Sequence, residues 1–284
     1  MTDRSEPETL PLTAESWLLQ LPLAALDFET TGLGPHRGDR VIEVAVVRGK
    51  AGETPKTWHT LIDPERSVAA TQIHGITDAM VAGRPRFAEV ADELFRQLEG
   101  AVLVAHNAAF DLSFLEMELA RVGRTLPPLV VLDTLGLARR VLALGDHRLA
   151  TLCARLGLTR DRAHRALDDA RATWELVQRL ALTADPSGHL RLGQAQLLSR
   201  RRTPEEHEGL LRRLEAARAQ GVPLVVDYVS GDAPGQPPTR RTITIVKLTR
   251  SRVDAFCHLR AADRSFRVDR LRIVTEGSTP PRAG

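Results

Sequence analysis

Two carboxylates spaced two residues apart, Asp27 and Glu29, stand at the end of an apolar stretch near the start of the chain. The preceding run, residues 21–25, is short enough for a buried strand and too short for a helix. Residues two apart on a strand share one face of the sheet, so both carboxylates would project together while Leu26 and Phe28 point into a core. Adjacent carboxylates repel each other unless a cation lies between them or one binds a proton. This segment alone therefore fits either a cation site or a solvated acidic pair at a strand end.

Further groups of the same kind occur where a strand or a loop leads into a predicted helix. Asp111 follows a short apolar strand pattern at 101–105, and His164, Asp168 and Asp169 stand at the start of another helix. Such junctions form the rim of an α/β sheet, where sites usually lie. Four carboxylates suit the hard cations Mg²⁺ or Mn²⁺ and suit structural zinc poorly.

An all-oxygen set of this size predicts a pair of divalent ions and the hydrolysis of phosphodiesters. Two ions about 3.5–4 Å apart activate a water and stabilise the charge that grows on the phosphate and the leaving oxygen. A neutral histidine beside that water can take its proton, because histidine titrates near working pH, and His164 is the candidate. Adjacent helix residues point about 100° apart, so only one of Asp168 and Asp169 can face the metal.

Three segments resemble the three motifs of the DEDDh family, the DnaQ-like 3′–5′ exonucleases that include the epsilon subunit of DNA polymerase III. The segments are residues 27–32, 106–111 and 164–170, and they follow the family's order. The resemblance covers about residues 21–182. Any one of these motifs would be weak by itself, whereas three in the right order are a strong signal.

The resemblance also selects between alternatives that the residues leave open. In this family the catalytic Asp lies five residues after the His and directly before a small residue, which favours Asp169 over Asp168. A sister family has a tyrosine in place of His164. The single tyrosine of this chain, Tyr228, lies far outside the matching region, so the histidine version is expected.

The resemblance implies a role for each member of the set. Asp27 would bridge two Mg²⁺ or Mn²⁺ ions, Glu29 and Asp169 would complete the ion that holds the attacking water, and Asp111 would act mainly through bound waters. His164 would be the general base. The terminal nucleotide would be held by Thr30, Thr31, Leu33 and Phe110.

Three other polar residues of the matching region are expected to have structural places. His106 and Asn107 would brace the turn into the helix that carries Asp111, and direct catalysis by either residue is the alternative. His74, in the segment 72–77, is expected to be a surface-loop histidine, although contact with the nucleic acid strand is an alternative.

The order of the expected strands and helices that carry these residues predicts an α/β fold. Three strands in series precede an alternation of strands and helices, which is the pattern of a mixed sheet with flanking helices; the resemblance implies a ribonuclease H-like sheet of five strands. The expected strands are an opening strand that begins with the run 21–25 and carries Asp27 and Glu29, followed by 41–47, 57–62, 101–105 and 130–134. The expected helices are 87–98, a helix that Asp111 begins, 135–143, 148–156 and 166–181.

Domain boundaries follow from changes in composition. The predicted organisation is a disordered lead-in at 1–16, a DnaQ-like exonuclease domain at 17–182, a linker and helix at 183–221, a small β module at 222–275, and a tail at 276–284. Strands of the β module are expected at 222–229, 241–249, 252–260 and 264–274.

Composition describes a globular protein of 284 residues with 43% hydrophobic and 26% charged residues. The apolar runs are too short to span a bilayer, and the acidic N-terminus does not resemble a signal peptide. Cys153 and Cys257 are isolated, so neither a zinc cluster nor a disulfide framework is expected. A cytoplasmic protein without a membrane partner is the simplest prediction.

Charge is distributed unevenly along the chain. Residues 186–284 contain 18 Arg and Lys against 10 Asp and Glu, a net of +8, and because the whole chain carries +3, residues 1–185 carry −5. An acidic front and a basic back suit a cation-binding catalytic part and a part that meets a polyanion. The alternative is an arginine-rich composition that reflects coding bias alone.

The basic C-terminal part resembles the WYL domain, a small Sm-like barrel that binds nucleic acid or a ligand. The resemblance lies in the segments 225–228, 240–243, 257–260 and 264–271, although the Trp-Tyr-Leu triplet itself is absent. Arginines near aromatic residues supply phosphate contacts and stacking surfaces. The alternative is an arginine-decorated barrel whose aromatic residues form its core. The candidate nucleic-acid-binding residues are Tyr228, Arg241, Arg260, Arg264, Arg267 and Arg270, with His258 and Phe266 nearby.

Together these patterns predict a metal-dependent 3′–5′ exonuclease that acts on DNA 3′ ends, preferably single-stranded, in repair or proofreading. A polymerase or another repair protein is a possible partner. One alternative is an exonuclease that trims RNA, because these motifs do not recognise the 2′-hydroxyl. The alternative from another class is a non-catalytic regulator that senses nucleic acid or a ligand.

Overall fold

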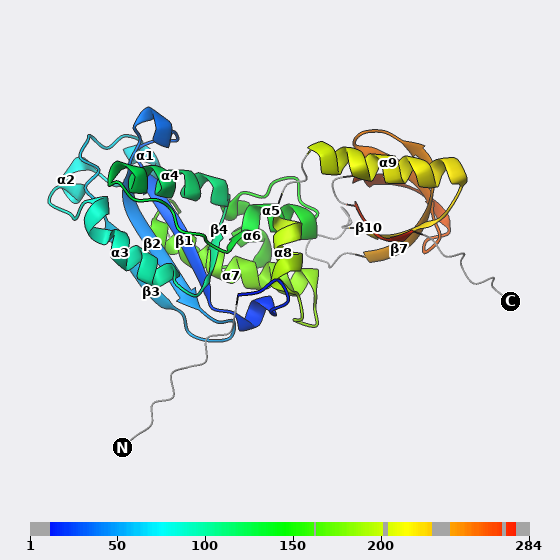
Figure 1. The fold of residues 1–284 in the computed structure, drawn as a ribbon, viewed down its shortest axis with the longest axis horizontal. Coiled ribbons are helices and arrows are strands. Elements are labelled where there is room, and N and C mark those ends of the chain that lie inside the picture. Colours follow the sequence, from blue (N-terminus) through cyan, green and yellow to red (C-terminus); the bar gives the residue numbers. More distant parts are fainter. Residues whose placement is uncertain (1–11, 162, 201–203, 229–238, 269–270, 277–284) are drawn as a thin grey trace, which may run out of the picture. The chain divides into compact units, whose positions relative to one another are not determined.

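The structure is a computed structural model, and it divides into two compact units that are each described by themselves (Figure 1). The first unit comprises Met1–Leu137 and Asp146–Ser199, and the second comprises Ala138–Gly145 and Arg200–Gly284. Within the described part of the chain, no helix is long and apolar enough to cross a membrane. The described residues are 12–161, 163–200, 204–228, 239–268 and 271–276.

A mixed five-stranded sheet in the order β3-β2-β1-β4-β5 forms the centre of the first unit. β2 is antiparallel to both β1 and β3, whereas β4 is parallel to both β1 and β5. The predicted mixed sheet is therefore confirmed. Its strands are β1 (Leu23–Thr30), β2 (Val41–Gly49), β3 (Lys56–Leu61), β4 (Val102–Ala105) and β5 (Val131–Asp133).

Helices cover both faces of this sheet, as in a ribonuclease H-like α/β fold. The longest, α7, lies on one face, and α3 and α4 lie on the other (Figure 1). The helical segments that begin in the first unit are η1 (Leu18–Gln20), η2 (Pro35–Arg37), α1 (Thr71–His74), α2 (Asp78–Val81), α3 (Phe87–Leu98), α4 (Ala108–Arg121), α5 (Thr134–Val141), α6 (Leu149–Leu156), α7 (Ala166–Ala184) and α8 (Leu192–Ser199).

Alternation along β1 divides its side chains between two cores. Leu23 and Ala25 pack with α7, whereas Leu26 and Phe28 pack with α3 and α4. The period of two residues places Asp27 on the α7 face with Leu23 and Ala25. The predicted inward direction of Leu26 and Phe28 is correct, but the opposite face of the strand is covered as well.

β1 extends beyond the strand beside it. Its parallel pairing with β4 ends at Ala25 opposite Val104, whereas β1 continues to Thr30. After β1 the chain continues to β2 on one side of it, and after β4 the chain continues to β5 on the opposite side. The gap between β1 and β4 is therefore the point where the strand order reverses. Open α/β sheets bind ligands at such a point, because the loops diverge there and leave a crevice.

A buried glutamate ties α4 to the sheet. Glu118 accepts hydrogen bonds from Arg40 Nε at 2.9 Å and from the Val41 backbone N–H at 3.1 Å. Arg121 Nη1 lies 3.1 Å from the same carboxylate. These contacts fix the helix that carries Asp111 against the start of β2.

The expected lead-in and linker differ from the structure. Residues 12–16 are ordered on the first unit, where the Gly193 N–H donates to Ala14 O at 2.9 Å. Residues 1–11 lie outside the described part. α7 continues to Ala184, and α8 packs in the first unit with Leu192 and Ala195 buried in its core. Both segments are held by apolar contacts with residues that are distant in sequence, and local composition does not reveal such contacts.

The second unit combines α9 (Pro204–Gln220) with an antiparallel five-stranded sheet in the order β10-β6-β7-β8-β9. The predicted strand at 264–274 is two strands, β9 and β10, which lie at opposite edges of this sheet. Closure into an Sm-like barrel remains a prediction. The strands are β6 (Leu224–Tyr228), β7 (Thr239–Leu248), β8 (Arg252–Cys257), β9 (Ala262–Arg267) and β10 (Leu271–Glu276).

Aromatic residues of the second unit lie mainly in its core. Tyr228 and Phe266 are buried with ring centroids 4.8 Å apart, and the Tyr228 hydroxyl accepts from the Arg267 N–H at 3.3 Å. The prediction that Tyr228 and Phe266 offer stacking surfaces is therefore wrong, because the sheet needs their apolar rings inside. His258 is exposed and packs edge-on against Phe256 at 5.2 Å.

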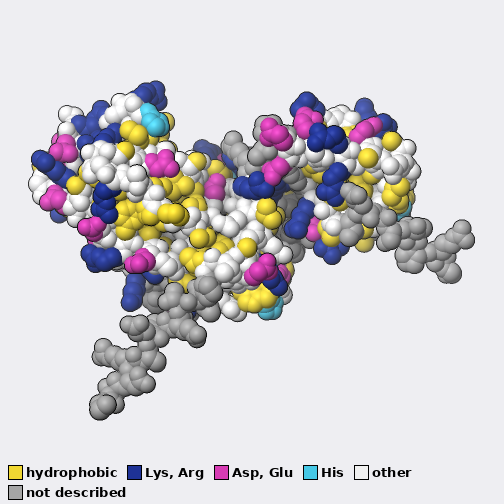
Figure 2. All heavy atoms as spheres, in the orientation of Figure 1, with side chains coloured by type: hydrophobic (Ala, Val, Ile, Leu, Met, Phe, Trp, Pro, Cys, Tyr) yellow, Lys and Arg dark blue, Asp and Glu magenta, His cyan; other side chains and the backbone are white. Residues whose placement is uncertain are grey.

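The predicted arginines of the second unit have different surroundings. Arg260, Arg264 and Arg267 are exposed. Arg241 is half-buried, with Nη1 3.8 Å from Cys257 Sγ and a buried Nε that has no hydrogen-bond partner. Arg270 lies outside the described residues. The visible face of this unit carries both basic and acidic side chains (Figure 2).

Candidate active site

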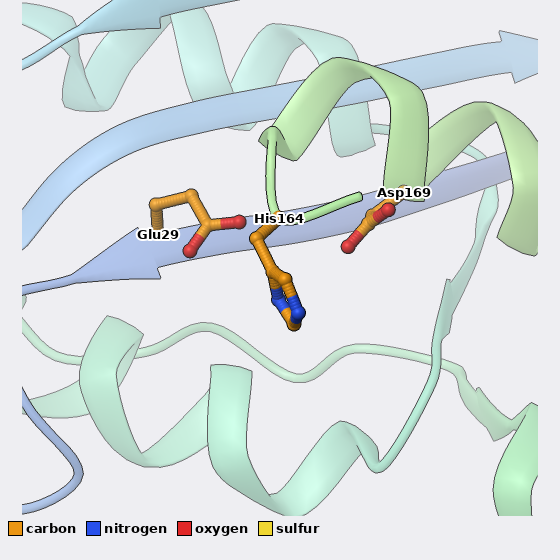
Figure 3. A group of neighbouring side chains, drawn as sticks. All are labelled: Glu29, His164 and Asp169. Carbon is orange, nitrogen blue, oxygen red and sulfur yellow. The ribbon is translucent and has the colours of Figure 1, made fainter. Parts of the chain in front are cut away.

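Three predicted residues meet where β1 ends and α7 begins. Glu29 comes from β1, His164 from the loop before α7, and Asp169 from the first turn of α7 (Figure 3). One ligand atom from each lies within 4.8 Å of the other two, a spacing that could hold a metal ion. Asp168 lies outside this group, 3.9 Å from Arg171. Oxygen ligands with one histidine suit Mg²⁺ or Mn²⁺.

Asp111 joins β1 from the other side of the gap between β1 and β4. Its Oδ1 accepts a hydrogen bond from the Phe28 backbone N–H at 3.2 Å. That N–H lies past the end of the β1–β4 pairing, so the carboxylate takes the place of a strand partner. Burial raises the pKa of Asp111 to about 8, while the hydrogen bond from Phe28 opposes the rise.

The carboxylates of the site repel one another. Burial raises the pKa of Asp27 well above its ordinary value, and the charges of its neighbours Asp111, Asp169 and Glu29 raise it further. Burial likewise raises the pKa of Glu29 to about 8, with a further contribution from Asp169. Four acidic groups in one largely buried place favour either protons or cations. The arrangement therefore fits a site for divalent cations.

Protein free of metal should lose stability as the pH rises from about 5 to about 9. Unfolded carboxyl groups ionise near pH 4, whereas Glu29 and Asp111 in the folded protein keep their protons up to about pH 8. Between these values the folded state binds more protons than the unfolded state, so the free energy of unfolding falls with pH. Urea denaturation with a chelator at about pH 5.5, 7 and 9 measures this. Asp111→Asn should flatten the fall, and a rise over the range would contradict it.

The residue that carries the candidate base has an unusual backbone conformation. His164 has a φ of 60°, in the left-handed region that non-glycine residues seldom occupy. The side chain is exposed and lies between those of Glu29 and Asp169 (Figure 3). Because this conformation is uncommon, the surrounding contacts must hold it in place.

A buried ion pair next to His164 supplies such contacts. Arg165 donates from Nη2 to Glu43 Oε1 at 2.7 Å and from Nε to Oε2 at 3.1 Å, and the Ala166 N–H donates to Oε2 at 3.0 Å. Glu43 lies on β2 directly opposite Glu29. One carboxylate thus fixes the start of α7 to the sheet beside the site.

Replacing Glu43 by Ala should destabilise the protein by about 3 kcal/mol, because it leaves the Arg165 charge and the Ala166 N–H without their partner. Chemical denaturation measures the change. Glu175→Ala provides the matched control, because Glu175 is an exposed glutamate on α7, the helix that Glu43 holds. This substitution should change the free energy of unfolding by less than about 0.5 kcal/mol. Equal effects of the two substitutions would show that the ion pair contributes nothing.

Asp169 has a cationic partner that the sequence does not predict. Arg160, in the loop between α6 and α7, donates from Nε to Oδ1 at 2.5 Å and from Nη2 to Oδ2 at 2.7 Å. Both side chains are about nine-tenths buried, at 10% and 8% exposed. The candidate metal ligand is therefore engaged by a guanidinium through both of its oxygens.

The loop after β1 is shaped by Asp39. Its Oδ2 accepts from the Gly34 N–H at 2.9 Å, and Thr31 Oγ1 donates to Oδ1 at 3.4 Å. A Cβ at Gly32 would lie 2.4 Å from Asp39 Oδ2, so a side chain does not fit there. Leu33 then stands at the tip with 81% of its surface exposed.

The start of α4 is braced by the end of β5. Asp133 Oδ1 accepts from the N–H groups of Asn107 at 2.9 Å and Leu135 at 3.0 Å. His106 Nδ1 lies 2.9 Å from Thr134 Oγ1, and its Nε2 lies 3.0 Å from the carbonyl oxygen of His147. The predicted bracing role of His106 and Asn107 agrees with these contacts.

His74 is buried, so its prediction as a surface-loop residue is wrong. Its Nδ1 accepts from the Ile76 N–H at 3.0 Å, and its Nε2 donates to Ala69 O at 3.1 Å. Burial lowers the pKa of His74. Phe110 is half-buried, with its ring 5.0 Å from that of Phe114.

Two residues important to the site were missed from the sequence, with different signals. Glu43 interrupts an apolar strand pattern at 41–47, and a charge in the middle of a buried strand points to a buried partner. Arg160 has no such signal, because an arginine in a polar loop is the ordinary surface pattern.

The sequence profile described as Exonuclease matches residues 24–177, more than half of the chain's 284 residues. The chain belongs to the exonuclease family. The match spans β1 to α7 and therefore includes all five residues of the predicted catalytic set.

Known proteins similar to the chain agree with this assignment. A DNA polymerase III subunit epsilon-like protein of Rhodobacter capsulatus is 42% identical over 174 residues, covering 59% of this chain and 25% of the relative. A PolC-type DNA polymerase III of Thermotoga maritima is 35% identical over 195 residues, covering 68% of this chain and 14% of the relative. The chain thus spans a quarter or less of these relatives.

A solved structure of exonuclease I is similar in fold, with a TM-score of 0.53 and 19% identity. The similarity covers 84% of this chain and 55% of that one. At this identity the similarity supports the ribonuclease H-like exonuclease fold of the first unit.

Proposed function

We propose that the protein is a metal-dependent 3′–5′ exonuclease of the DEDDh type, with Asp27, Glu29, Asp111 and Asp169 as metal ligands and His164 as general base. The observation that carries this proposal is the convergence of Glu29, His164 and Asp169 within 4.8 Å. The raised pKa values of Asp27 and Asp111 support it, because burial and mutual repulsion prepare these groups for cations.

Bound Mg²⁺ or Mn²⁺ ions would supply an activated water and charge stabilisation at the scissile phosphate. The four proposed carboxylate ligands, on β1, α4 and α7, would hold these ions. His164 would accept a proton from the attacking water, and because its side chain is exposed, it could pass that proton to solvent. The Glu43–Arg165 pair keeps the loop of His164 in its uncommon conformation.

The side chains near the carboxylates support the proposed assignment to the histidine type. His164 lies beside Glu29 and Asp169, whereas the single tyrosine, Tyr228, belongs to the core of the second unit. A tyrosine in the equivalent place would define the sister type.

The end of the substrate strand would lie over the loop after β1. Leu33 offers an exposed apolar side chain for packing against a base, and Phe110 an aromatic ring braced by Phe114. Thr30 and Thr31 are buried and shape this loop, since Thr30 Oγ1 donates to Gly32 O at 2.6 Å and Thr31 N–H to Arg40 O at 2.9 Å. Their contribution to nucleotide binding would come through the backbone.

DNA 3′ ends, preferably single-stranded, are the proposed substrate, and repair or proofreading the proposed setting. The epsilon-like and PolC-type relatives favour DNA and suggest a polymerase or another repair protein as a partner. RNA is the alternative polymer. A cytoplasmic location is proposed with these functions.

The decisive experiment gives the protein 5′-labelled DNA and RNA strands with Mg²⁺ or Mn²⁺, with a chelator as the negative control. Shortening from the 3′ end of DNA, abolished by the chelator and by Asp27→Ala, is the expected result. Shortening of RNA alone would favour the alternative substrate. If neither polymer is shortened, the exonuclease proposal fails and the non-catalytic regulator becomes the better hypothesis.

The second unit is proposed to be a WYL-like, Sm-like barrel that grips nucleic acid through its arginines. Its net charge and the exposed Arg260, Arg264 and Arg267 support this. Arg241 supports it as well, because its half-buried guanidinium has a sulfur contact and no carboxylate partner among the described residues. A small anionic ligand is the alternative occupant.

Replacing the three exposed arginines by Gln in the full chain should weaken strand binding while leaving the rate at saturating substrate unchanged. Each lost phosphate contact on a single strand lowers the salt-dependence slope by about 0.7, so the slope should fall by about 2. Fluorescence anisotropy with labelled single strands at several salt concentrations measures both quantities. Arg218→Gln is the control, since Arg218 is paired with Glu215 on α9. Unchanged binding would show that the second unit serves another ligand.

A further inference from the structure

Arg160 occupies an exceptional position among the cations of the first unit. Its guanidinium grips Asp169 with two parallel hydrogen bonds of 2.5 and 2.7 Å, the two-pronged geometry that makes arginine–carboxylate pairs strong. Among the described residues, no other arginine or lysine side chain forms an ion pair with any of the four proposed metal ligands. The neighbouring pairs engage other carboxylates: Arg165 holds Glu43, and Arg171 approaches Asp168.

The charge of Arg160 reaches beyond Asp169. It lowers the pKa of Asp27 and of Glu29, against the effects of burial and of their acidic neighbours. Asp169 in turn lies with Glu29 and His164 in the group that could hold a metal ion. Arg160 therefore neutralises part of the same cluster of negative charge that divalent cations would neutralise.

A cation bound by Asp169 would meet this guanidinium at close range. A carboxylate oxygen lies about 2.1 Å from a bound Mg²⁺ ion, and the arginine nitrogens lie 2.5 and 2.7 Å from the oxygens of Asp169. Two cations this close repel each other strongly in a site that is largely closed to solvent. Arg160 and a metal ion cannot both engage Asp169 in this way at low cost.

We propose that Arg160 is an internal counter-ion that competes with the metal ions for Asp169. It stabilises the protein before metal binds and must release Asp169 when metal binds, so it lowers the affinity of the site for metal. The inference rests on the proposed function, because it takes Asp169 to be a metal ligand. Its consequence is a site that is half filled at a higher metal concentration than the same carboxylates would need without Arg160.

Isothermal titration of the full chain with Mn²⁺ tests the competition. Arg160→Gln removes the charge and should bind Mn²⁺ about tenfold more tightly or better, where tenfold corresponds to about 1.4 kcal/mol. The same variant without metal should unfold at a lower temperature than the unmodified protein. Arg160→Lys keeps the positive charge but cannot make two parallel hydrogen bonds to Asp169. Its affinity for Mn²⁺ should therefore lie between those of the unmodified protein and Arg160→Gln.

Arg171→Gln is the matched control, because Arg171 lies near the adjacent carboxylate of Asp168 and is 49% exposed. Its affinity for Mn²⁺ should stay within about twofold of the unmodified protein. Equal or weaker Mn²⁺ binding by Arg160→Gln would overturn the proposal while leaving the proposed function intact. Absence of Mn²⁺ binding by the unmodified protein would instead remove the metal site itself, and with it both proposals.

A second measurement needs no substitution and so does not depend on the folding of a variant. The Nε–H of Arg160, held by Asp169, should give a protected NMR signal in protein free of metal. Titration with diamagnetic Mg²⁺ should shift this signal and remove its protection over the same concentration range in which Mg²⁺ raises the unfolding temperature. A signal that stays unchanged at saturating Mg²⁺ would show that the ion pair persists, and would refute the competition.

Discussion

Replacing Asp27 by Asn is expected to lower the rate of nucleotide release from DNA 3′ ends by about 10³–10⁴-fold, the equivalent of 4–5.5 kcal/mol. The charges of Asp111, Asp169 and Glu29 all act on Asp27, and the proposed function takes Asp27 as the ligand shared by two ions. An amide oxygen is a weaker ligand than a carboxylate for a hard cation, so the variant loses charge stabilisation at the phosphate. Single-turnover cleavage of a 5′-labelled strand measures the loss.

The same substitution should make the metal-free protein more stable. Burial and three acidic neighbours disfavour the charge of Asp27, so a neutral Asn relieves repulsion in the folded state. The gain should be larger at about pH 9 than at about pH 5, since the carboxyl of the unmodified protein keeps its proton at the lower pH. Asp92→Asn, on an exposed part of α3, is the control that should change neither quantity. Full activity of Asp27→Asn would remove the two-metal hypothesis.

Replacing His164 by Asn is expected to slow nucleotide release by about 10²–10⁴-fold, the contribution of a positioned general base. Asparagine is chosen because residue 164 has a φ of 60°, a conformation that Asn adopts more readily than most residues. The variant should therefore fold like the unmodified protein, and any loss of rate would come from the missing imidazole.

His164 also lies close enough to Glu29 and Asp169 to be a metal ligand, and metal binding distinguishes the two roles. A general base predicts that His164→Asn binds Mn²⁺ with unchanged affinity while its rate falls. A ligand predicts that affinity and rate fall together. His59→Asn, an exposed position on β3, should leave both unchanged. If His164→Asn cleaves at the full rate, another group must take the proton.

The strands of the first sheet were predictable from local sequence patterns, because the periodicity of a strand shows in a few neighbouring residues. The β-branched run at 41–47 and the apolar run before Asp27 became β2 and β1, since strand and helix periodicities are set within a few residues. The second unit was less predictable. Two short strands that follow each other closely in sequence, β9 and β10, have the same local pattern as one long strand, although they lie at opposite edges of the sheet.

The C-terminal aromatic residues show the limit of inference from residue type. Tyr228 and Phe266 have the chemistry for stacking on bases, and they equally have the apolar surface that a small sheet must bury. The structure places both in the core, because β6 and β9 turn these positions inward. Residue type alone does not determine the face of a strand on which a side chain lies.

The sequence by itself determined the chemistry of the candidate site. Carboxylates and histidine have the same ligand and proton-transfer properties wherever they lie, and their order along the chain is characteristic of one family of exonucleases. Tertiary structure alone decided how these groups are controlled. Glu43 meets Arg165 across 122 residues, and Arg160 reaches Asp169 through the turn that starts α7. The first pairing forms because the fold brings distant segments together, and the second depends on the path of the chain between α6 and α7. Neither pairing follows from a local pattern of residue types.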